Sequence, residues 1–226
     1  MATDRARAPR TPTRVQTMEG RAARLYARVR QSEAQQASFR EQAARFVADL
    51  PEGAEILEVA PGPGYLAAEM ARSGRVRVTG LDVSHTMLEI AAGTARAVGV
   101  SVTLRHGDVR AMPFADMSFE RIVCQAAFKS FPEPLRALDE MHRVLRPGGQ
   151  AIIQDMRGDA TGRAIAREAA TAGHGLARLW VRLALTGLRR QALTPAQFDA
   201  LARRSAFGPG VITQNALGLE VRLTRA

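Results

Sequence analysis

Residues 54–67 combine a short apolar run, a glycine turn and a helix start, and no other stretch constrains the fold as strongly. The apolar run is Ile56 to Val59, and Pro61-Gly62-Pro63-Gly64 follows it directly. From Tyr65 onward the residues favour a helix. Glycine permits unusual backbone dihedrals and lets a ligand approach the backbone closely. The free amides at the start of the helix suit the polar or anionic part of a nucleotide-like ligand.

A second unit follows and narrows the type of ligand. Residues 76–82 form a β-branched run that ends in Asp82, twenty positions after Gly62. A carboxylate at the tip of a second strand can accept hydrogen bonds from two ribose hydroxyls. Because Gly62 to Ala67 also fits the Gly-x-Gly-x-x-Ala pattern of dinucleotide enzymes, NAD(P) competes with other adenosine ligands at this point.

The composition predicts one soluble α/β domain. The chain has 226 residues, 46% of them hydrophobic, which is enough for a buried core. The sequence contains no apolar run of about eighteen residues, so we expect no transmembrane helix. The formal charge of +10 comes almost wholly from arginine, a bias typical of GC-rich bacterial genomes, and it permits an anionic partner. The single cysteine, Cys124, excludes an internal disulfide and fits a reducing cytoplasm.

Helical and strand patterns alternate along the chain. Residues 1–17, which carry Arg5, Arg7, Arg10 and Arg14, predict a disordered basic tail. Residues 18–53 predict two helices that break near Ser32. Residues 54–226 form the main domain, and its further strands are expected at 100–106, 118–124, 150–156, 210–213 and 217–224, the last two antiparallel. Its helices are expected at 84–98 and 134–144, and at 157–207, a helical insertion that should cap the site.

Several motifs in this order resemble the class I S-adenosylmethionine-dependent methyltransferases, especially the small-molecule branch that includes the ubiquinone/menaquinone-type enzymes. They are Glu58 to Gly64, Gly107-Asp108-Val109 followed by Met112-Pro113-Phe114, and Arg143 to Gly149. Ala60 stands where the family has a glycine. The resemblance covers residues 54–156 and the terminal strand pair. It implies an α/β fold with a Rossmann-like, doubly wound, seven-stranded sheet, an antiparallel C-terminal strand, N-terminal helices and a helical cap.

The same resemblance implies a site for S-adenosylmethionine, with S-adenosylhomocysteine as its product. In the family's pattern Glu58 orients the methionine end, Asp82 takes the ribose hydroxyls, and Asp108 accepts from the adenine amine. The full set of cofactor-binding residues that it implies is Glu58, Ala60, Pro61, Gly62, Gly64, Asp82, Val83, Met87, Gly107, Asp108, Val109 and Gln125.

Around the acceptor the sequence predicts neighbours but assigns no catalytic residue. Methyl transfer from a sulfonium is an in-line displacement, so the protein mainly has to hold the acceptor and exclude water. The residues expected near the acceptor are Tyr26, Phe128, Lys129, His174 and Trp180. His174, in a loop of the insertion, is the first candidate for a base, and an exposed loop histidine is its alternative. No metal site is expected, because acidic residues are sparse in the insertion.

These features predict a cytoplasmic enzyme that methylates a small molecule. One alternative is an RNA methyltransferase that uses the basic tail, although no RNA-binding module is visible. Another is a protein of this fold that binds the cofactor without transferring methyl. A dehydrogenase fits poorly because no substrate domain follows the nucleotide half, and DNA is not an expected partner. Residues 176–188 could form a helix that lies on a membrane, although such helices more often cover a sheet. The sequence is also compatible with a homodimer.

Overall fold

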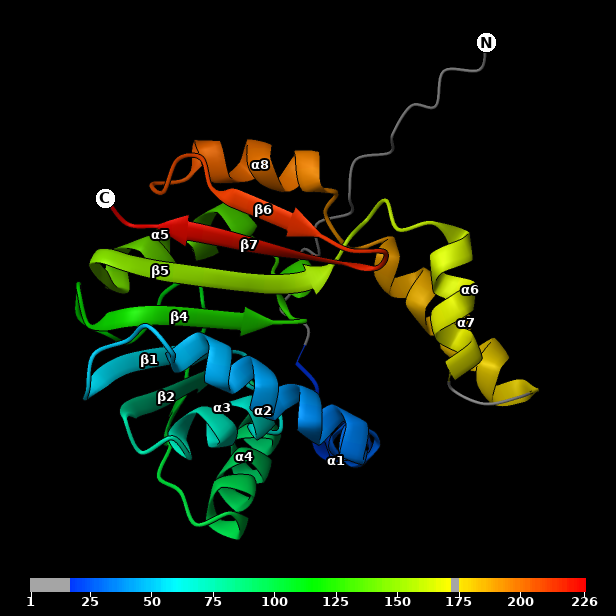
Figure 1. Ribbon diagram of the computed structural model, residues 1–226, viewed down its shortest axis with the longest axis horizontal. Coiled ribbons are helices and arrows are strands. Elements are labelled where there is room, and N and C mark those ends of the chain that lie inside the picture. Colours follow the sequence, from blue (N-terminus) through cyan, green and yellow to red (C-terminus); the bar gives the residue numbers. More distant parts are fainter. Residues whose placement is uncertain (1–16, 172–174) are drawn as a thin grey trace.

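A seven-stranded sheet forms the centre of the computed structural model, which describes residues 17–171 and 175–226 (Figure 1). The predicted tail up to residue 16 and His174 therefore lie outside the described residues. The strands are β1 (Ala54–Val59), β2 (Val76–Asp82), β3 (Thr103–His106), β4 (Phe119–Gln125), β5 (Leu145–Met156), β6 (Val211–Gln214) and β7 (Gly218–Thr224). Their order in the sheet is β3-β2-β1-β4-β5-β7-β6. The first five strands pair in parallel and β7 is antiparallel to both neighbours, which confirms the predicted fold class.

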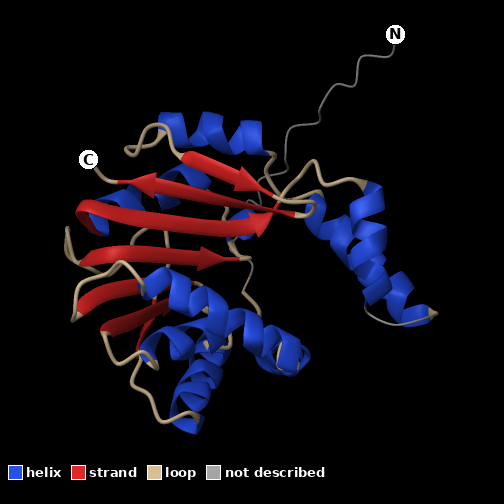
Figure 2. Cartoon of the chain, in the orientation of Figure 1, coloured by secondary structure: helices blue, strands red, loops and turns tan. Residues whose placement is uncertain are grey.

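Helices cover both faces of the sheet (Figure 2). They are α1 (Gly20–Val29), α2 (Glu33–Val47), α3 (Tyr65–Ala71), α4 (His85–Ala97), α5 (Pro134–Val144), α6 (Gly162–Thr171), α7 (Leu176–Arg189), α8 (Pro195–Arg204) and the short 3-10 helix η1 (Phe128–Ser130). Successive side chains of a strand point to opposite faces, so Ile56 packs with α2 and α3 while Leu57 packs with α5 and α8. Each face thus has its own apolar core.

Two predicted helix starts are confirmed by their caps. The side chain of Ser32 accepts a hydrogen bond from the amide of Gln35 at 3.4 Å, and Ser84 accepts one from Met87 at 3.0 Å. α2 thus begins after the turn that follows α1, and α4 begins just after β2.

One strand is longer than the sequence predicts. β5 begins at Leu145 instead of residue 150, because Leu145 pairs with Phe119 of β4 beyond a register shift. The glycine-rich segment in between is also held, since Gly148 donates to the carbonyl of Arg225 at 2.8 Å and Arg225 donates to that of Gly149 at 2.9 Å. A turn sequence is therefore drawn into the sheet by pairing with the C-terminal end of the chain.

The carboxyl ends of the parallel strands point toward α1, α6 and α7, which stand beyond the sheet at that side (Figure 1). The strand order reverses between β1 and β4, and ligands of open α/β sheets bind outside the carboxyl ends at such a point. Among the described residues, no helix is both long and apolar enough to cross a membrane.

Candidate functional site

The turn after β1 has a left-handed backbone at three positions. Ala60, Gly62 and Gly64 have φ values of 55°, 53° and 75°. A Cβ added to Gly64 would lie 2.7 Å from that of Ala91, so Gly64 lets α3 pack closely on α4. A Cβ added to Gly62 would meet no protein atom within 4 Å. Gly64 therefore serves packing, whereas the backbone at Gly62 is open to a ligand.

Asp82, at the end of β2, ties this turn to the next helix. Its carboxylate accepts hydrogen bonds from the amide of Gly62 at 3.1 Å and from that of Ser84 at 2.9 Å. Burial raises the pKa of Asp82, and the hydrogen bonds from these two amides offset part of that shift. The carboxylate is thus held rigidly where β1, β2 and α4 meet.

Glu58 is the buried acid of the site. Glu58 is 3% exposed, and its Oε2 accepts no hydrogen bond from any described residue. Burial and, as a smaller cause, the nearby charge of Asp82 together raise the pKa of Glu58 to about 8. A cationic or hydrogen-bond-donating group beside Oε2 would satisfy this atom and favour the ionised carboxylate.

Asp108 follows β3 and is engaged by Arg110, a neighbour that the sequence analysis did not identify. Nη2 of Arg110 lies 2.7 Å from Oδ2 of Asp108, and Nη1 of Arg110 lies 2.5 Å from a carboxylate oxygen of Glu133. The hydrogen bonds from Arg110 lower the pKa of Asp108. A ligand amine that approaches Asp108 would therefore meet a carboxylate whose charge is already compensated.

Most of the residues predicted to bind the cofactor surround two adjoining cavities. The first, which we name the loop cavity, has a volume of about 190 Å³. Of the predicted residues it is lined by Ala60, Gly62, Asp82, Val83, Met87, Gly107, Asp108 and Val109. The second, the Glu58 cavity, has about 50 Å³ and is lined by Glu58, Pro61 and Gln125, among others. Gly64 lines neither cavity, because it packs on α4.

Helix α1 forms a wall of the loop cavity that its own sequence pattern does not reveal. Glu19 accepts hydrogen bonds from the amides of His85 and Thr86 at 3.1 and 3.0 Å and so caps α4 from a distant part of the chain. The hydroxyl of Tyr65 donates to the carbonyl of Ala27 at 3.0 Å. Tyr26, predicted to lie near the acceptor, lines both the loop cavity and the Glu58 cavity.

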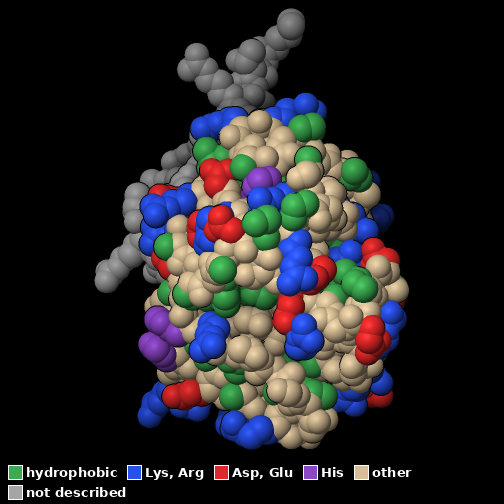
Figure 3. All heavy atoms as spheres, turned by 90° about the vertical axis from the view of Figure 1, so that its left-hand side faces the viewer, with side chains coloured by type: hydrophobic (Ala, Val, Ile, Leu, Met, Phe, Trp, Pro, Cys, Tyr) green, Lys and Arg blue, Asp and Glu red, His purple; other side chains and the backbone are tan. Residues whose placement is uncertain are grey.

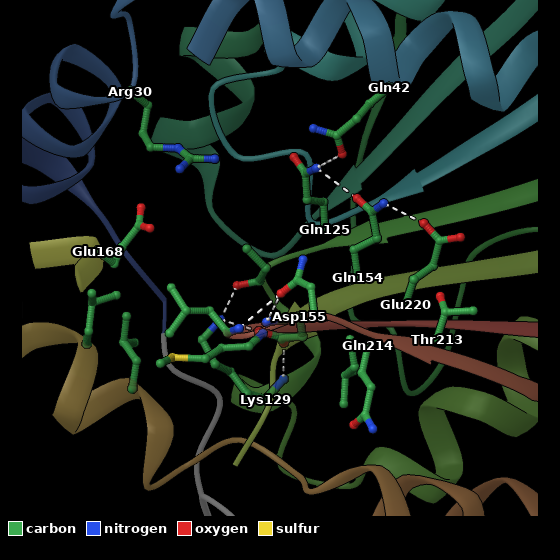
Figure 4. Close-up of a pocket in the computed structure, with 18 of the residues that line it drawn as sticks. Arg30, Gln42, Gln125, Lys129, Gln154, Asp155, Glu168, Thr213, Gln214 and Glu220 are labelled. Atoms are coloured by element: carbon green, nitrogen blue, oxygen red, sulfur yellow. Dashed lines mark hydrogen bonds and ion pairs between the residues drawn. The ribbon is translucent and has the colours of Figure 1, made fainter. Parts of the chain in front are cut away.

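A third cavity of about 650 Å³ lies at the ends of β4, β5 and β7, and we name it the sheet-end cavity (Figure 4). Gln125 and Ala126 line both this cavity and the Glu58 cavity, so the two adjoin. Lys129 lies at its base in a buried ion pair, with Nζ 2.8 Å from Oδ1 of Asp155. The amide of Lys129 donates to the other oxygen of Asp155 at 2.8 Å. The ammonium group is thus neutralised and held in place.

A row of amides and one carboxylate continues this polar surface across the sheet (Figure 4). Nε2 of Gln125 lies 2.5 Å from Oε1 of Gln42 and 3.0 Å from Oε1 of Gln154. Gln154 in turn donates to Glu220 at 2.7 Å, and Arg45 pairs with the same carboxylate at 2.7 Å. Fully connected polar networks of this kind hold their members in fixed positions.

The opposite wall of the sheet-end cavity is more apolar. It comes from the pair α6 and α7, through Leu185, Leu188 and the carboxylate of Glu168. The cavity therefore combines a polar surface on the sheet with an apolar wall on a helical hairpin. Such a shape suits a small molecule with a polar ring and an apolar part.

The other residues predicted near the acceptor lie elsewhere. Phe128 is 2% exposed and packs in the core, its ring centroid 4.8 Å from that of Phe198, because η1 turns it toward α8. Trp180 lies on α7 with 70% of its surface exposed, and it lines none of the three cavities. Met18, Ser130 and Phe131 line the loop cavity without having been predicted, because only the docking of α1 and η1 brings them there.

Residues 57–153 match the protein family described as "Methyltransferase domain". The chain is 34% identical over 108 residues to the demethylmenaquinone methyltransferase of Deinococcus radiodurans, an alignment that covers 47% of this chain and 45% of that relative. It is 38% identical over 104 residues to a ubiquinone/menaquinone biosynthesis C-methyltransferase of Bdellovibrio bacteriovorus, covering 45% and 43% of the two chains. The alignments thus span less than half the length of these relatives.

Among solved structures, the fold is similar to that of an S-adenosylmethionine-dependent methyltransferase from Aquifex aeolicus, with a TM-score of 0.67. The superposition covers 89% of this chain and 98% of the other at 15% sequence identity. The similarity therefore extends beyond the matched domain to the arrangement of the whole sheet and its helices.

Proposed function

Because residues 57–153 match a methyltransferase domain, we propose that this chain is a class I methyltransferase that transfers a methyl group from S-adenosylmethionine to a small-molecule acceptor. S-adenosylmethionine supplies an electrophilic methyl group when it is bound. The protein's part in such a displacement is to hold both reactants in line and to exclude water.

The observation that carries this proposal is the buried, unsatisfied Oε2 of Glu58 next to the open backbone of Gly62. A methionine ammonium group would provide the donor that Glu58 lacks. Asp82 would take the ribose hydroxyls at the rim of the loop cavity, and Met87 and Val109 would contact the adenine. The residues present thus fit the charge and polarity of S-adenosylmethionine.

We place the acceptor in the sheet-end cavity. This cavity adjoins the Glu58 cavity at Gln125 and Ala126, which is where the methyl group would have to be transferred. Its polar surface and apolar wall suit a quinol-type ring with an apolar substituent, and the names of the two relatives support such an acceptor. Because Lys129 is paired with Asp155, we assign it a positioning role instead of that of a base.

We propose the following organisation of the chain. Residues 1–17 are a basic tail, residues 18–53 are helices of which α1 covers the cofactor, and residues 54–226 form the catalytic domain in the cytoplasm. Within the insertion 157–207, α6 and α7 supply the wall next to the acceptor, while Phe198 of α8 packs in the core.

Calorimetric titration with S-adenosylmethionine, S-adenosylhomocysteine and NADH tests the cofactor. We expect binding of the two sulfur ligands, loss of that binding in Asp82→Ala, and unchanged binding in Asp199→Ala, which alters an exposed acid on α8. Preference for NADH, or no binding of the sulfur ligands, would overturn the proposal.

Release of S-adenosylhomocysteine in the presence of demethylated quinols then tests methyl transfer. Product formed only with RNA would favour the RNA alternative, and binding without any product would favour a non-enzymatic role.

A further inference from the structure

Helix α7 carries an apolar face that no other part of the described chain covers. Leu176, Leu179, Trp180 and Leu183 follow the i, i+3, i+4, i+7 spacing of one helix face, and they are 75%, 50%, 70% and 56% exposed. Single exposed apolar residues are common on protein surfaces, but a contiguous group marks a place of interaction. We name these four residues the outer face of α7.

Arginine dominates the charge of the hairpin that carries the outer face, and on α7 it lies on the side opposite the apolar residues. Within the described residues of α6, α7 and position 190 there are six arginines, Arg163, Arg167, Arg178, Arg182, Arg189 and Arg190, and one acid, Glu168, which lines the sheet-end cavity. The side of the molecule that carries the amino ends of the parallel strands is different, because basic and acidic side chains are interspersed there (Figure 3). A second copy of this chain would bring the same positive charge against the outer face, so charge opposes self-association at this surface.

The outer face belongs to the same hairpin that walls the sheet-end cavity. Leu185 and Leu188 of α7 line that cavity, and the hairpin projects beyond the carboxyl ends of the strands (Figure 1). A partner that contacts the outer face would therefore lie beside the cavity that we assign to the acceptor.

We propose that the outer face of α7 docks the protein on an anionic lipid bilayer. Large apolar side chains beside arginine, with no acid on the same helix, are what a helix needs to lie in the plane of a bilayer interface. The leucines and Trp180 would enter the headgroup boundary, while the arginines on the polar side of α7, of which Arg182 is nearer the outer face than Arg178, would attract anionic headgroups. This docking does not depend on the proposed methyl transfer, and its test uses no acceptor.

Trp180 makes the test direct, because it is the only tryptophan of the chain. The full chain is titrated with vesicles of phosphatidylcholine and with vesicles that also contain phosphatidylglycerol. We expect the mixed vesicles to bind the protein more tightly, to shift Trp180 emission to shorter wavelength, and to quench it when the acyl chains carry bromine. The variant Leu179→Asp/Leu183→Asp should bind at least about tenfold more weakly, because it places charge on the face that enters the bilayer.

Two matched variants complete the experiment. Val211→Asp, at a residue that is 63% exposed on β6, should bind vesicles like the wild type. Arg178→Glu/Arg182→Glu should lose the preference for anionic vesicles. Equal binding by the Leu179→Asp/Leu183→Asp variant, unchanged Trp180 emission in bound protein, or a lipid-free dimer that buries Trp180 would each overturn the proposal. Thermal unfolding of each variant shows that the fold is retained.

Discussion

Two residues at the carboxyl end of β1 are held in energetically unfavourable states. Ala60 has a left-handed backbone, with φ at 55°, and Glu58 is buried with one carboxylate oxygen unpaired. The surrounding structure holds the first of these states, since the amide of Ala60 donates to the carbonyl of Leu81 at 2.8 Å and fixes the turn. Such local costs persist where the fold over-determines them, and they often occur where a ligand binds.

The strain at Ala60 predicts a stabilising substitution. Ala60→Gly should raise the free energy of unfolding by about 0.5 to 1 kcal/mol, because glycine avoids the Cβ clash of left-handed backbone and its larger unfolded-state entropy offsets only part of that gain. Urea unfolding measures the change. The control is Ala48→Gly, at a residue with φ of −57°, where the same substitution should destabilise. Destabilisation at both positions would show that the turn does not strain Ala60.

The raised pKa of Glu58 predicts a dependence of stability on pH. The usual value is 4.5 and the folded value is about 8, so between these the folded state binds more protons than the unfolded state. Stability from this group is complete below about pH 4.5 and is lost as the pH rises through about 8. The wild type should lose on the order of 5 kcal/mol across this range relative to Glu58→Gln.

Urea unfolding of both proteins at several pH values tests this expectation. Glu33→Gln, an exposed change in the first turn of α2, serves as the control and should follow the wild type. Parallel curves for the wild type and Glu58→Gln would show that the carboxyl group is ionised in the folded protein at neutral pH.

At the scale of elements, long-range contacts position the pieces that surround the cavities. Glu19 fixes the start of α1 on α4, and Asp155 of β5 holds η1 through Lys129. Neither α1 nor η1 has an internal feature that would place it there. The wall of the loop cavity and the base of the sheet-end cavity therefore depend on a few polar contacts between elements.

The contact between η1 and β5 should be costly to break on one side only. Lys129→Met leaves the carboxylate of Asp155, whose side chain is 5% exposed, without its counter-ion, and should destabilise the protein by about 3 to 5 kcal/mol. The double variant Lys129→Met/Asp155→Asn should recover much of this loss in urea unfolding. Arg203→Met, which breaks the exposed pair with Asp199, should change the free energy of unfolding far less, because solvent screens that pair. Equal costs at the two pairs would mean that Asp155 is hydrated.

At the scale of the whole molecule, the net charge of +10 attracts any polyanion, so RNA binding alone would not identify an RNA substrate. Removal of residues 1–16, which carry Arg5, Arg7, Arg10 and Arg14, should weaken RNA binding and reduce its salt dependence. Turnover of a small acceptor should be unchanged. Fluorescence anisotropy at several salt concentrations measures the first effect, and a parallel loss of turnover would connect the tail to catalysis.

Local sequence patterns determined the framework of this protein. The strand–turn–helix at residues 54–67, the strand that ends in Asp82, and the caps at Ser32 and Ser84 were all readable, because periodicity, glycine turns and helix caps act over a few residues. The order of the strand ends predicted the rim that carries Glu58, Asp82 and Asp108, and the family resemblance of these motifs implied the doubly wound sheet.

Only the tertiary structure decided what surrounds those residues. It pairs Lys129 with Asp155, turns Phe128 into the core, exposes Trp180 on α7, and brings Met18 and Tyr26 of the N-terminal segment to the loop cavity. These outcomes depend on contacts between residues that are tens of positions apart. The energy of such contacts comes from burial and charge in the packed molecule, so local sequence patterns do not predict these contacts.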